Sequence, residues 1–280
     1  MKTYPLLLLL TLSVLAGCNR KPAPDRQRIL TVSIEPLRYF AEAIAGERFR
    51  VTTLVPRGSS PETYEPAPRQ LVDLSESKAY LSVGELGFEK TWMPKITEGV
   101  PYLPIINLSK GIEPLPGEHG TGVDPHTWTS PQNASVIARN LCDALCRIDS
   151  AGSSYYEKRT AALLARIDSV DNVVRHVLKR CTARTFLIYH PALGYLARDY
   201  GLTQLSLEEG GKEPTTDNLR TLINRTKAGA VRVLFVQQEF SEAGVRALAD
   251  ETGIRIVRIN PLSYDWPDET IRIANALCHE

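Results

Sequence analysis

The sequence lacks several features that mark common classes of protein. Its 280 residues contain 33 Lys and Arg against 32 Asp and Glu, and no basic cluster stands out. Nothing therefore points to nucleic-acid binding, which needs a basic patch or stripe. Internal repeats and low-complexity segments are absent, and no apolar stretch after the N-terminal region is long enough to span a bilayer. The length suffices for two small domains or one large one.

The N-terminus is typical of an export signal. Lys2 supplies a positive start, and residues 6–15 form an apolar run that is too short to cross a membrane. Small residues then lead directly into Cys18, and this Leu-Ala-Gly-Cys sequence resembles the bacterial lipobox, in which the cysteine is lipidated. We expect a signal peptide at residues 1–17 and a flexible tether at residues 18–27, which is rich in Lys, Arg and Pro. The alternative is an ordinary secretory signal with an incidental cysteine.

Four other cysteines follow, and export permits them to form a disulfide. Cys142 and Cys146 are four residues apart in a helical pattern. This spacing places both on one helix face but suits a disulfide poorly, so we expect buried free thiols. For Cys181 and Cys278, pairing stays open.

Short β-branched runs alternate with longer helical patterns in two blocks, which predicts parallel βαβ units. The sequence therefore predicts an α/β protein with two lobes, each with a mainly parallel sheet flanked by helices. The expected strands cover residues 29–34, 50–55, 79–83 and 103–106 in the first block, and 185–189, 233–236 and 254–259 in the second. The first helix is expected at residues 37–45, ending at Gly46.

A different pattern lies between the two blocks. Residues 153–180 contain neither proline nor glycine, and apolar side chains recur at three- and four-residue steps. This predicts one amphipathic helix on the order of 40 Å long. We expect it to join an N-terminal lobe at residues 28–152 to a C-terminal lobe at residues 181–280. Because a continuous helix resists bending, we infer small lobe movements rather than wide closure.

Two of the five histidines stand in contexts that suit a ligand site. Pro125 fixes the backbone before His126, and Trp128 anchors the segment after it. His190 follows an apolar strand at its C-terminal end, where open α/β sheets place their ligands. Imidazole suits zinc, copper, iron or nickel. The sequence therefore predicts a metal site with one histidine from each lobe.

A turn-rich loop after the second strand, residues 55–66, adds a carboxylate. Pro61 places Glu62, and a carboxylate held in this way can bind metal. Alternatively, it caps a helix that begins at Pro66 and Ala67.

Several separated motifs follow one another along the chain. They are Pro61-Glu62-Thr63-Tyr64-Glu65-Pro66, Gly87-Phe88-Glu89 with Trp92, Asp124-Pro125-His126-Thr127-Trp128, Tyr189-His190 with Gly194-Tyr195, Tyr200-Gly201-Leu202, Glu213-Pro214 and Asn260-Pro261-Leu262. Together, from the first strand to about Ala274, they resemble the TroA-like (cluster A-I) solute-binding proteins of zinc and manganese ABC importers. The resemblance implies two α/β lobes joined by a rigid helix, with the metal held between the lobes.

The resemblance implies metal ligands at Glu62, His126, His190 and Asn260. The family usually has histidine in place of Glu62 and aspartate in place of Asn260. Three histidines and one aspartate carry one negative charge, and so does the set in this chain. We infer that the carboxylate has moved from one lobe to the other while the total charge stayed the same; chance compensation is the alternative.

The fourth ligand stays open, because the Asn260 amide oxygen is a weak zinc ligand. Water, Asp265, Glu208 or Glu209 are the alternatives. Zinc accepts four-coordinate sets of nitrogen and oxygen, whereas manganese asks for more oxygen. We therefore rank Zn²⁺ first, Mn²⁺ second and ferrous iron third.

The expected function is capture of a divalent transition metal in the periplasm or at the cell surface, with delivery to the permease of an ABC-type importer. A lipid anchor is expected to hold the monomer at a membrane. Within the same fold, the alternatives are a manganese- or iron-binding importer component, an adhesin or a surface metal sensor. A zinc hydrolase is a further alternative, because three protein ligands are the catalytic number. The sequence has no His-Glu-x-x-His helix and no nucleophile beside a base, so we predict a binding protein and not an enzyme.

Overall fold

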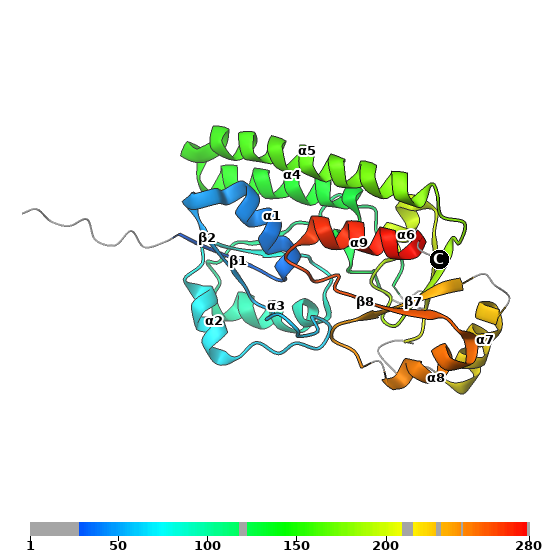
Figure 1. Cartoon of the computed structure of the whole chain (residues 1–280). Helices are drawn as coiled ribbons and strands as arrows, with labels where there is room; N and C mark the ends of the chain where they lie inside the picture. The colour runs from blue at the N-terminus through cyan, green and yellow to red at the C-terminus, as the bar shows by residue number, and fades with distance from the viewer. Residues whose placement is uncertain (1–27, 118–121, 209–214, 228–230, 242, 279–280) are drawn as a thin grey trace, which may run out of the picture.

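The chain forms two α/β halves with a layer of helices running along both (Figure 1). The computed structural model describes residues 28–117, 122–208, 215–227, 231–241 and 243–278. The predicted signal peptide, tether and Cys18 lie outside the described residues. Among the helices of the described part, none has the length and apolar character needed to cross a membrane.

The N-terminal half contains a four-stranded parallel sheet in the order β2-β1-β3-β4. Its elements are β1 (Ile29–Val32), α1 (Glu35–Ala45), β2 (Arg50–Thr53), α2 (Pro68–Ser75), β3 (Ala79–Ser82), α3 (Gly87–Gly99), β4 (Ile105–Asn107) and α4 (Pro131–Ile148), with short 3-10 turns at Gly46–Arg48, Thr127–Thr129 and Ser150–Gly152. Helix α1 starts with Pro36 in its first turn, a position that tolerates the missing N–H. It ends at Gly46, where φ is +55°, as the sequence predicts.

The C-terminal half repeats this plan, with the parallel strand order β6-β5-β7-β8. Its elements are β5 (Thr185–Ile188), α6 (Gly194–Tyr200), β6 (Thr203–Ser206), α7 (Thr216–Lys227), β7 (Val231–Gln237), α8 (Ala243–Thr252), β8 (Arg255–Ile259) and α9 (Trp266–Cys278). Strand β6 is not among the predicted strands. It lies at the edge of the sheet and its side chains are exposed or half-buried, so it lacks the apolar run that marks the other strands.

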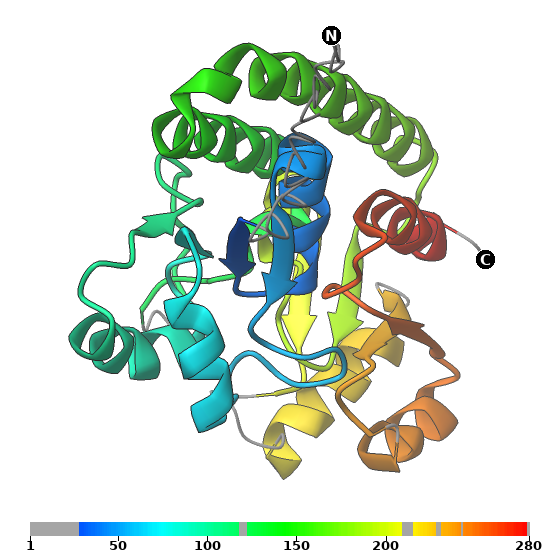
Figure 2. The same cartoon turned by 90° about the vertical axis from the view of Figure 1, so that its left-hand side faces the viewer.

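Helix α5 (Ser153–Leu178) is the predicted long helix, two residues shorter at its C-terminal end. It runs the length of the molecule beside α4, above the sheets (Figure 1), and it also contacts α1 and α9. In Figure 2, α1 and α9 lie beneath the α4–α5 layer. The predicted fold class, two α/β lobes with parallel sheets joined by one long helix, is confirmed.

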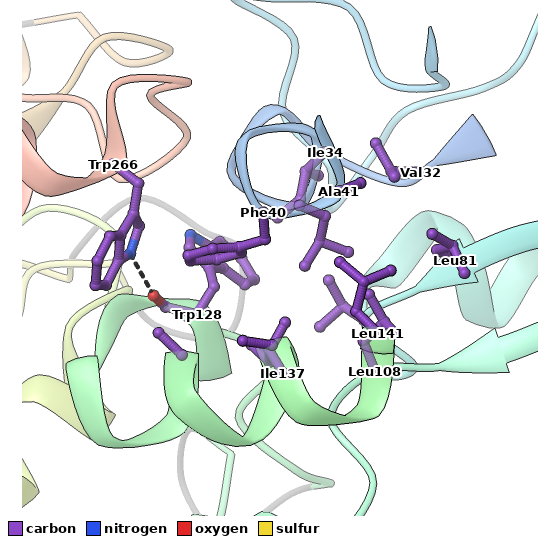
Figure 3. Packing of buried hydrophobic residues seen from close by; sticks show 14 of the residues in the cluster. Val32, Ile34, Phe40, Ala41, Leu81, Leu108, Trp128, Ile137, Leu141 and Trp266 are labelled. Carbon is purple, nitrogen blue, oxygen red and sulfur yellow. Dashed lines mark hydrogen bonds between the residues drawn. The ribbon is translucent and has the colours of Figure 1, made fainter. Parts of the chain in front are cut away.

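One hydrophobic core continues from the N-terminal half to α9. The Trp266 ring packs against Phe40, with the ring centroids 5.2 Å apart. Its Nε1 donates to the carbonyl oxygen of Trp128 at 2.7 Å (Figure 3). Trp128 Nε1 in turn donates to the carbonyl oxygen of Pro261 at 2.8 Å. The two halves are thus joined by buried hydrogen bonds in both directions, beside the site described below.

The cysteines divide into a disulfide and two thiols. Cys181 and Cys278 form a disulfide, which links the segment after α5 to the last residue of α9. Cys142 and Cys146, both on α4, are free as predicted, but only Cys142 is buried, whereas Cys146 is half-buried. The disulfide therefore fixes α9 to the C-terminal end of the long helix.

Candidate metal centre

Three side chains from three separate loops meet between the two halves of the molecule. Glu62 lies in the loop after β2, His126 precedes the 3-10 turn Thr127–Thr129, and His190 follows β5. One potential ligand atom from each lies within 4.8 Å of the other two. The Nε2 atoms of His126 and His190 are 3.2 Å apart, and Glu62 Oε1 is 3.9 Å from His126 Nε2.

The two oxygens of Glu62 have different surroundings. Oε2 accepts the backbone N–H of Gly87, the first residue of α3, at 3.3 Å. A Cβ at Gly87 would collide with the Glu62 backbone, so the close approach requires glycine there. Oε1 is buried and has no hydrogen-bond partner among the described residues. Glu62 therefore caps α3, whereas the start of α2 is capped by Gln70 through the Ala67 N–H.

Asp124 holds the His126 ring in place. Its Oδ1 accepts the backbone N–H of His126 at 2.9 Å and lies 2.8 Å from the ring Nδ1. A carboxylate cannot donate, so Nδ1 carries the hydrogen and the lone pair of Nε2 points toward His190. Asp124 Oδ2 packs so closely on Gly194 that a Cβ there would collide with it.

Strand register places the partners of His190. Ile188 pairs with Ser206 on β6 and with Phe235 on β7. Two residues after these paired positions on the three strands come His190, Glu208 and Gln237, so His190 lies beside the other two. Its Nδ1 is 2.9 Å from Glu208 Oε2, and Gln237 bonds to both the N–H and the carbonyl of His190. This ring too directs an Nε2 lone pair toward the other histidine.

This arrangement fits a cation. Two nitrogen lone pairs that face each other repel unless a proton or a metal lies between them. Two imidazole nitrogens bound to one tetrahedral zinc at about 2.0–2.1 Å lie roughly 3.3–3.4 Å apart, close to the observed 3.2 Å. Glu62 Oε1, at 3.9 Å from His126 Nε2, needs to approach by about half an ångström to join the same ion.

Negative charge surrounds the two rings. Burial by itself lowers the pKa of His126, but its hydrogen bond to Asp124 and the charges of Asp124, Glu62 and Glu208 outweigh burial. The net pKa of His126 is therefore raised, which shows that the site favours a positive charge at this ring.

The comparisons with known proteins agree with this geometry. The model of the ZnuA family, described as zinc-uptake complex component A, periplasmic, matches residues 30–270. The chain belongs to the ZnuA family. Its resemblance to zinc and manganese solute-binding proteins is thereby confirmed. The family consists of metal-binding proteins and not of enzymes, which removes the hydrolase alternative.

Individual relatives cover most of the chain. A crystal structure of ZnuA superposes with a TM-score of 0.86 at 35% sequence identity, covering 90% of this chain and 98% of that one. The high-affinity zinc uptake system protein ZnuA of Bacillus subtilis (strain 168) is 26% identical over 85% of this chain and 79% of its own length. The zinc-binding lipoprotein AdcA of Streptococcus pneumoniae (strain ATCC BAA-255 / R6) is 27% identical over 96% of this chain, which spans 57% of that protein.

Within this ZnuA-family chain, Asn260 does not line the hollow that Glu62, His126 and His190 share. Its Oδ1 accepts the backbone N–H of Leu262 at 3.1 Å. Its side chain lines a neighbouring hollow with Arg57 and Asp265, and Asp265 is exposed there. Of the alternatives, Glu208 is engaged behind His190, and Glu209 lies outside the described residues.

Several residues of the site are absent from the sequence-based set. Asp124 and Gln237 orient the two histidines, and Glu239 lines the same hollow as Glu62 and both rings. Glu239 follows β7 at the C-terminal edge of its sheet, the same kind of position that singles out His190 after β5. The position of Glu239 after a strand could therefore have indicated it, but no sequence motif surrounds it.

Proposed function

We propose that this ZnuA-family protein captures zinc outside the cytoplasm and delivers it to the permease of an ABC-type importer. One observation carries the proposal: Glu62 Oε1, a buried carboxylate oxygen without a hydrogen-bond partner, faces two imidazole nitrogens whose lone pairs converge. Glu62, His126 and His190 are the proposed ligands. An oxygen left in this state is costly unless a cation approaches it.

Zinc is the first choice of metal because of the donor atoms. Two imidazoles and a carboxylate form a set that zinc accepts at tetrahedral geometry, and the spacing of the two nitrogens suits it. Mn²⁺ is the alternative and ferrous iron comes third, since manganese is served better by oxygen-rich sites.

Calorimetric zinc titration of three histidine variants tests the proposal. We expect His126→Ala and His190→Ala each to weaken zinc binding at least about 100-fold, because each removes a direct ligand. His176→Ala is the matched control, since His176 is an exposed histidine on α5 far from the site in sequence. Unchanged zinc affinity in both His126→Ala and His190→Ala would contradict the proposed metal site.

We also propose that Cys18 carries a lipid anchor after removal of residues 1–17, with residues 18–27 as tether. The monomer then has lobes at residues 28–152 and 181–280, joined through residues 153–180. Support comes from the Leu-Ala-Gly-Cys sequence and from a relative that is named a lipoprotein. Labelling of the expressed protein with a fatty-acid analogue tests the anchor. The wild type is expected to label and to sediment with membranes, and Cys18→Ser to do neither.

A further inference from the structure

The hollow that contains the two histidines holds a second carboxylate, Glu239. Glu62, His126, His190 and Glu239 all line this hollow. Glu239 lies in the loop that follows β7, on the C-terminal side of the molecule, whereas Glu62 comes from the N-terminal half. The two carboxylates therefore belong to opposite halves of the same site.

The loop that carries Glu239 is fixed to His190 on both sides. Before it, Gln237 hydrogen-bonds to the backbone N–H and carbonyl of His190. After it, the Phe240 ring stacks on the His190 imidazole, with centroids 5.8 Å apart and planes at 25°. Glu239 is thus held next to a proposed ligand by contacts that do not involve its own carboxylate.

The Glu239 side chain lines the same hollow as the three proposed ligands. The side chain is half-buried, and burial raises the pKa of Glu239 above its ordinary value, although its own backbone N–H and the nearby His190 act in the opposite direction. It lies outside the group of Glu62, His126 and His190 atoms that are within 4.8 Å of one another, so a side-chain rotation is needed to reach an ion held by them.

The other described carboxylates and amides proposed for the fourth position are placed less well. The Asn260 oxygen accepts the Leu262 N–H and lines the neighbouring hollow. Asp265 lies in that hollow as well, and Glu208 contacts the far side of the His190 ring, at Nδ1.

We propose that Glu239 is the fourth metal ligand and closes the site over the ion. This inference rests on the proposed function. The ion is then held by one carboxylate and one imidazole from each half of the molecule. Two carboxylates and two neutral imidazoles balance the charge of a divalent cation. A closed four-coordinate set leaves no open position, which suits reversible capture rather than catalysis.

The test compares Glu239→Gln with a matched control, Glu65→Gln. Gln preserves the shape of Glu but removes the charge and most of the affinity for a cation. Glu65 is exposed in the loop that carries Glu62, so its substitution makes the same change in charge without touching the hollow. We expect Glu239→Gln to weaken zinc binding at least about tenfold and Glu65→Gln to leave it within about twofold.

A second measurement counts the ligands directly. Co²⁺ bound to four protein ligands absorbs visible light more strongly than Co²⁺ whose coordination is completed by several waters. Replacement of one protein ligand by water changes the energies and intensities of the Co²⁺ d–d bands, so the Glu239→Gln spectrum is expected to differ from that of the wild type, with Glu239→Asp between the two because its shorter side chain reaches less far. X-ray absorption on the zinc-loaded wild type is expected to give four nitrogen or oxygen neighbours, with the multiple scattering of two imidazoles.

Each outcome has a defined meaning. If Glu239→Gln binds zinc and absorbs like the wild type while His190→Ala loses binding, the fourth-ligand proposal is overturned and the proposed function stands. The proposal is also overturned if the loss occurs in Asn260→Ala instead, or if Glu65→Gln loses as much as Glu239→Gln. If His190→Ala retains full affinity, the proposed function itself fails.

Discussion

At the scale of single residues, the two oxygens of Glu62 have different surroundings, and the helix that Glu62 caps is α3 rather than the helix near Pro66 and Ala67 that the sequence suggested. One oxygen caps the first N–H of α3, and the other faces the histidines. The neutral isostere Gln retains an oxygen for the cap but loses the charge. Substitution of Glu62 by Gln therefore separates metal affinity from folding.

We predict that Glu62→Gln weakens zinc binding about 10- to 100-fold, whereas Asn260→Ala weakens it less than about threefold. The reason is that Glu62 carries a negative charge beside both histidines, whereas the Asn260 oxygen accepts the Leu262 N–H and lines the neighbouring hollow. Calorimetry on both variants measures the difference, and the melting temperatures of the apo proteins check that the folds are intact. Equal losses, or a larger loss at Asn260, would refute the migration of the carboxylate.

The raised pKa of His126 predicts how zinc affinity depends on pH. Zinc binds the neutral imidazole, so protons compete with the metal below the pKa of the ring. The pKa of His126 lies above its ordinary value of about 6.5. When the pH is lowered from 8, zinc affinity is therefore expected to begin to decrease before pH 6.5 is reached. A protonated His126 correspondingly stabilises the apo protein at low pH, and this contribution is lost as the pH rises through the raised pKa.

Asp124→Asn tests the cause of the shift. Without the Asp124 charge, burial lowers the pKa of His126, so the fall in affinity should move to lower pH. At pH 8 the variant should still bind zinc about 10- to 100-fold more weakly, because the ring loses its orienting carboxylate. Zinc titrations from pH 5 to 8 give both quantities, and superimposable pH profiles for the two proteins would contradict the explanation.

At the scale of helices and strands, local patterns predicted more of the molecule than of the site. The absence of proline and glycine over residues 153–180 left helix as the consistent conformation, and α5 occupies Ser153–Leu178. Strand β6 escaped prediction because an exposed edge strand has no apolar run. Glu208 and Gln237 reach His190 only through the pairing of β6 and β7 with β5, and strand pairing is not encoded in a local pattern.

The same limit applies to Glu239. His126 and His190 are recognised by the proline, tryptophan or strand beside them, but Glu239 follows two glutamines and precedes Phe240 without a motif. Its presence in the hollow depends on where β7 ends relative to the loop of the other half. Sequence therefore indicated both histidines and one carboxylate of the proposed ligand set, whereas the second proposed carboxylate required the assembled fold.

The disulfide between Cys181 and Cys278 gives a prediction for the elements that it joins. It closes a loop of 97 residues and fixes the end of α9 to the segment after α5. We expect the double substitution to serine to reduce the free energy of unfolding by about 2–4 kcal/mol, largely through the larger entropy of the unfolded chain. Urea denaturation with and without reductant measures it.

The double serine variant also provides the control. Reductant should lower the urea midpoint of the wild type to that of the variant and leave the variant itself unchanged. A wild type that is insensitive to complete reduction would show that the crosslink contributes nothing to stability.

At the scale of the whole molecule, the candidate metal site lies between halves that share one core. Trp266 and Trp128 connect them through buried indole-to-carbonyl hydrogen bonds, and α5 packs against α1 in one half and α9 in the other. Separating the halves widely would expose this apolar surface and break both bonds. Metal capture must therefore proceed through side-chain and loop movements at the site.

We predict that small-angle scattering gives nearly the same radius of gyration for apo and zinc-loaded protein, close to the roughly 18 Å expected for a compact chain of this size. Trp266→Phe removes the indole N–H and leaves the buried carbonyl of Trp128 without its partner, at a cost of about 1–3 kcal/mol. Because Phe retains most of the packing, the variant should fold but release zinc faster. A radius of gyration markedly larger for the apo protein than for the zinc-loaded one would instead show a hinge between the halves. The shared core would then not be what fixes the proposed ligands of the two halves relative to each other.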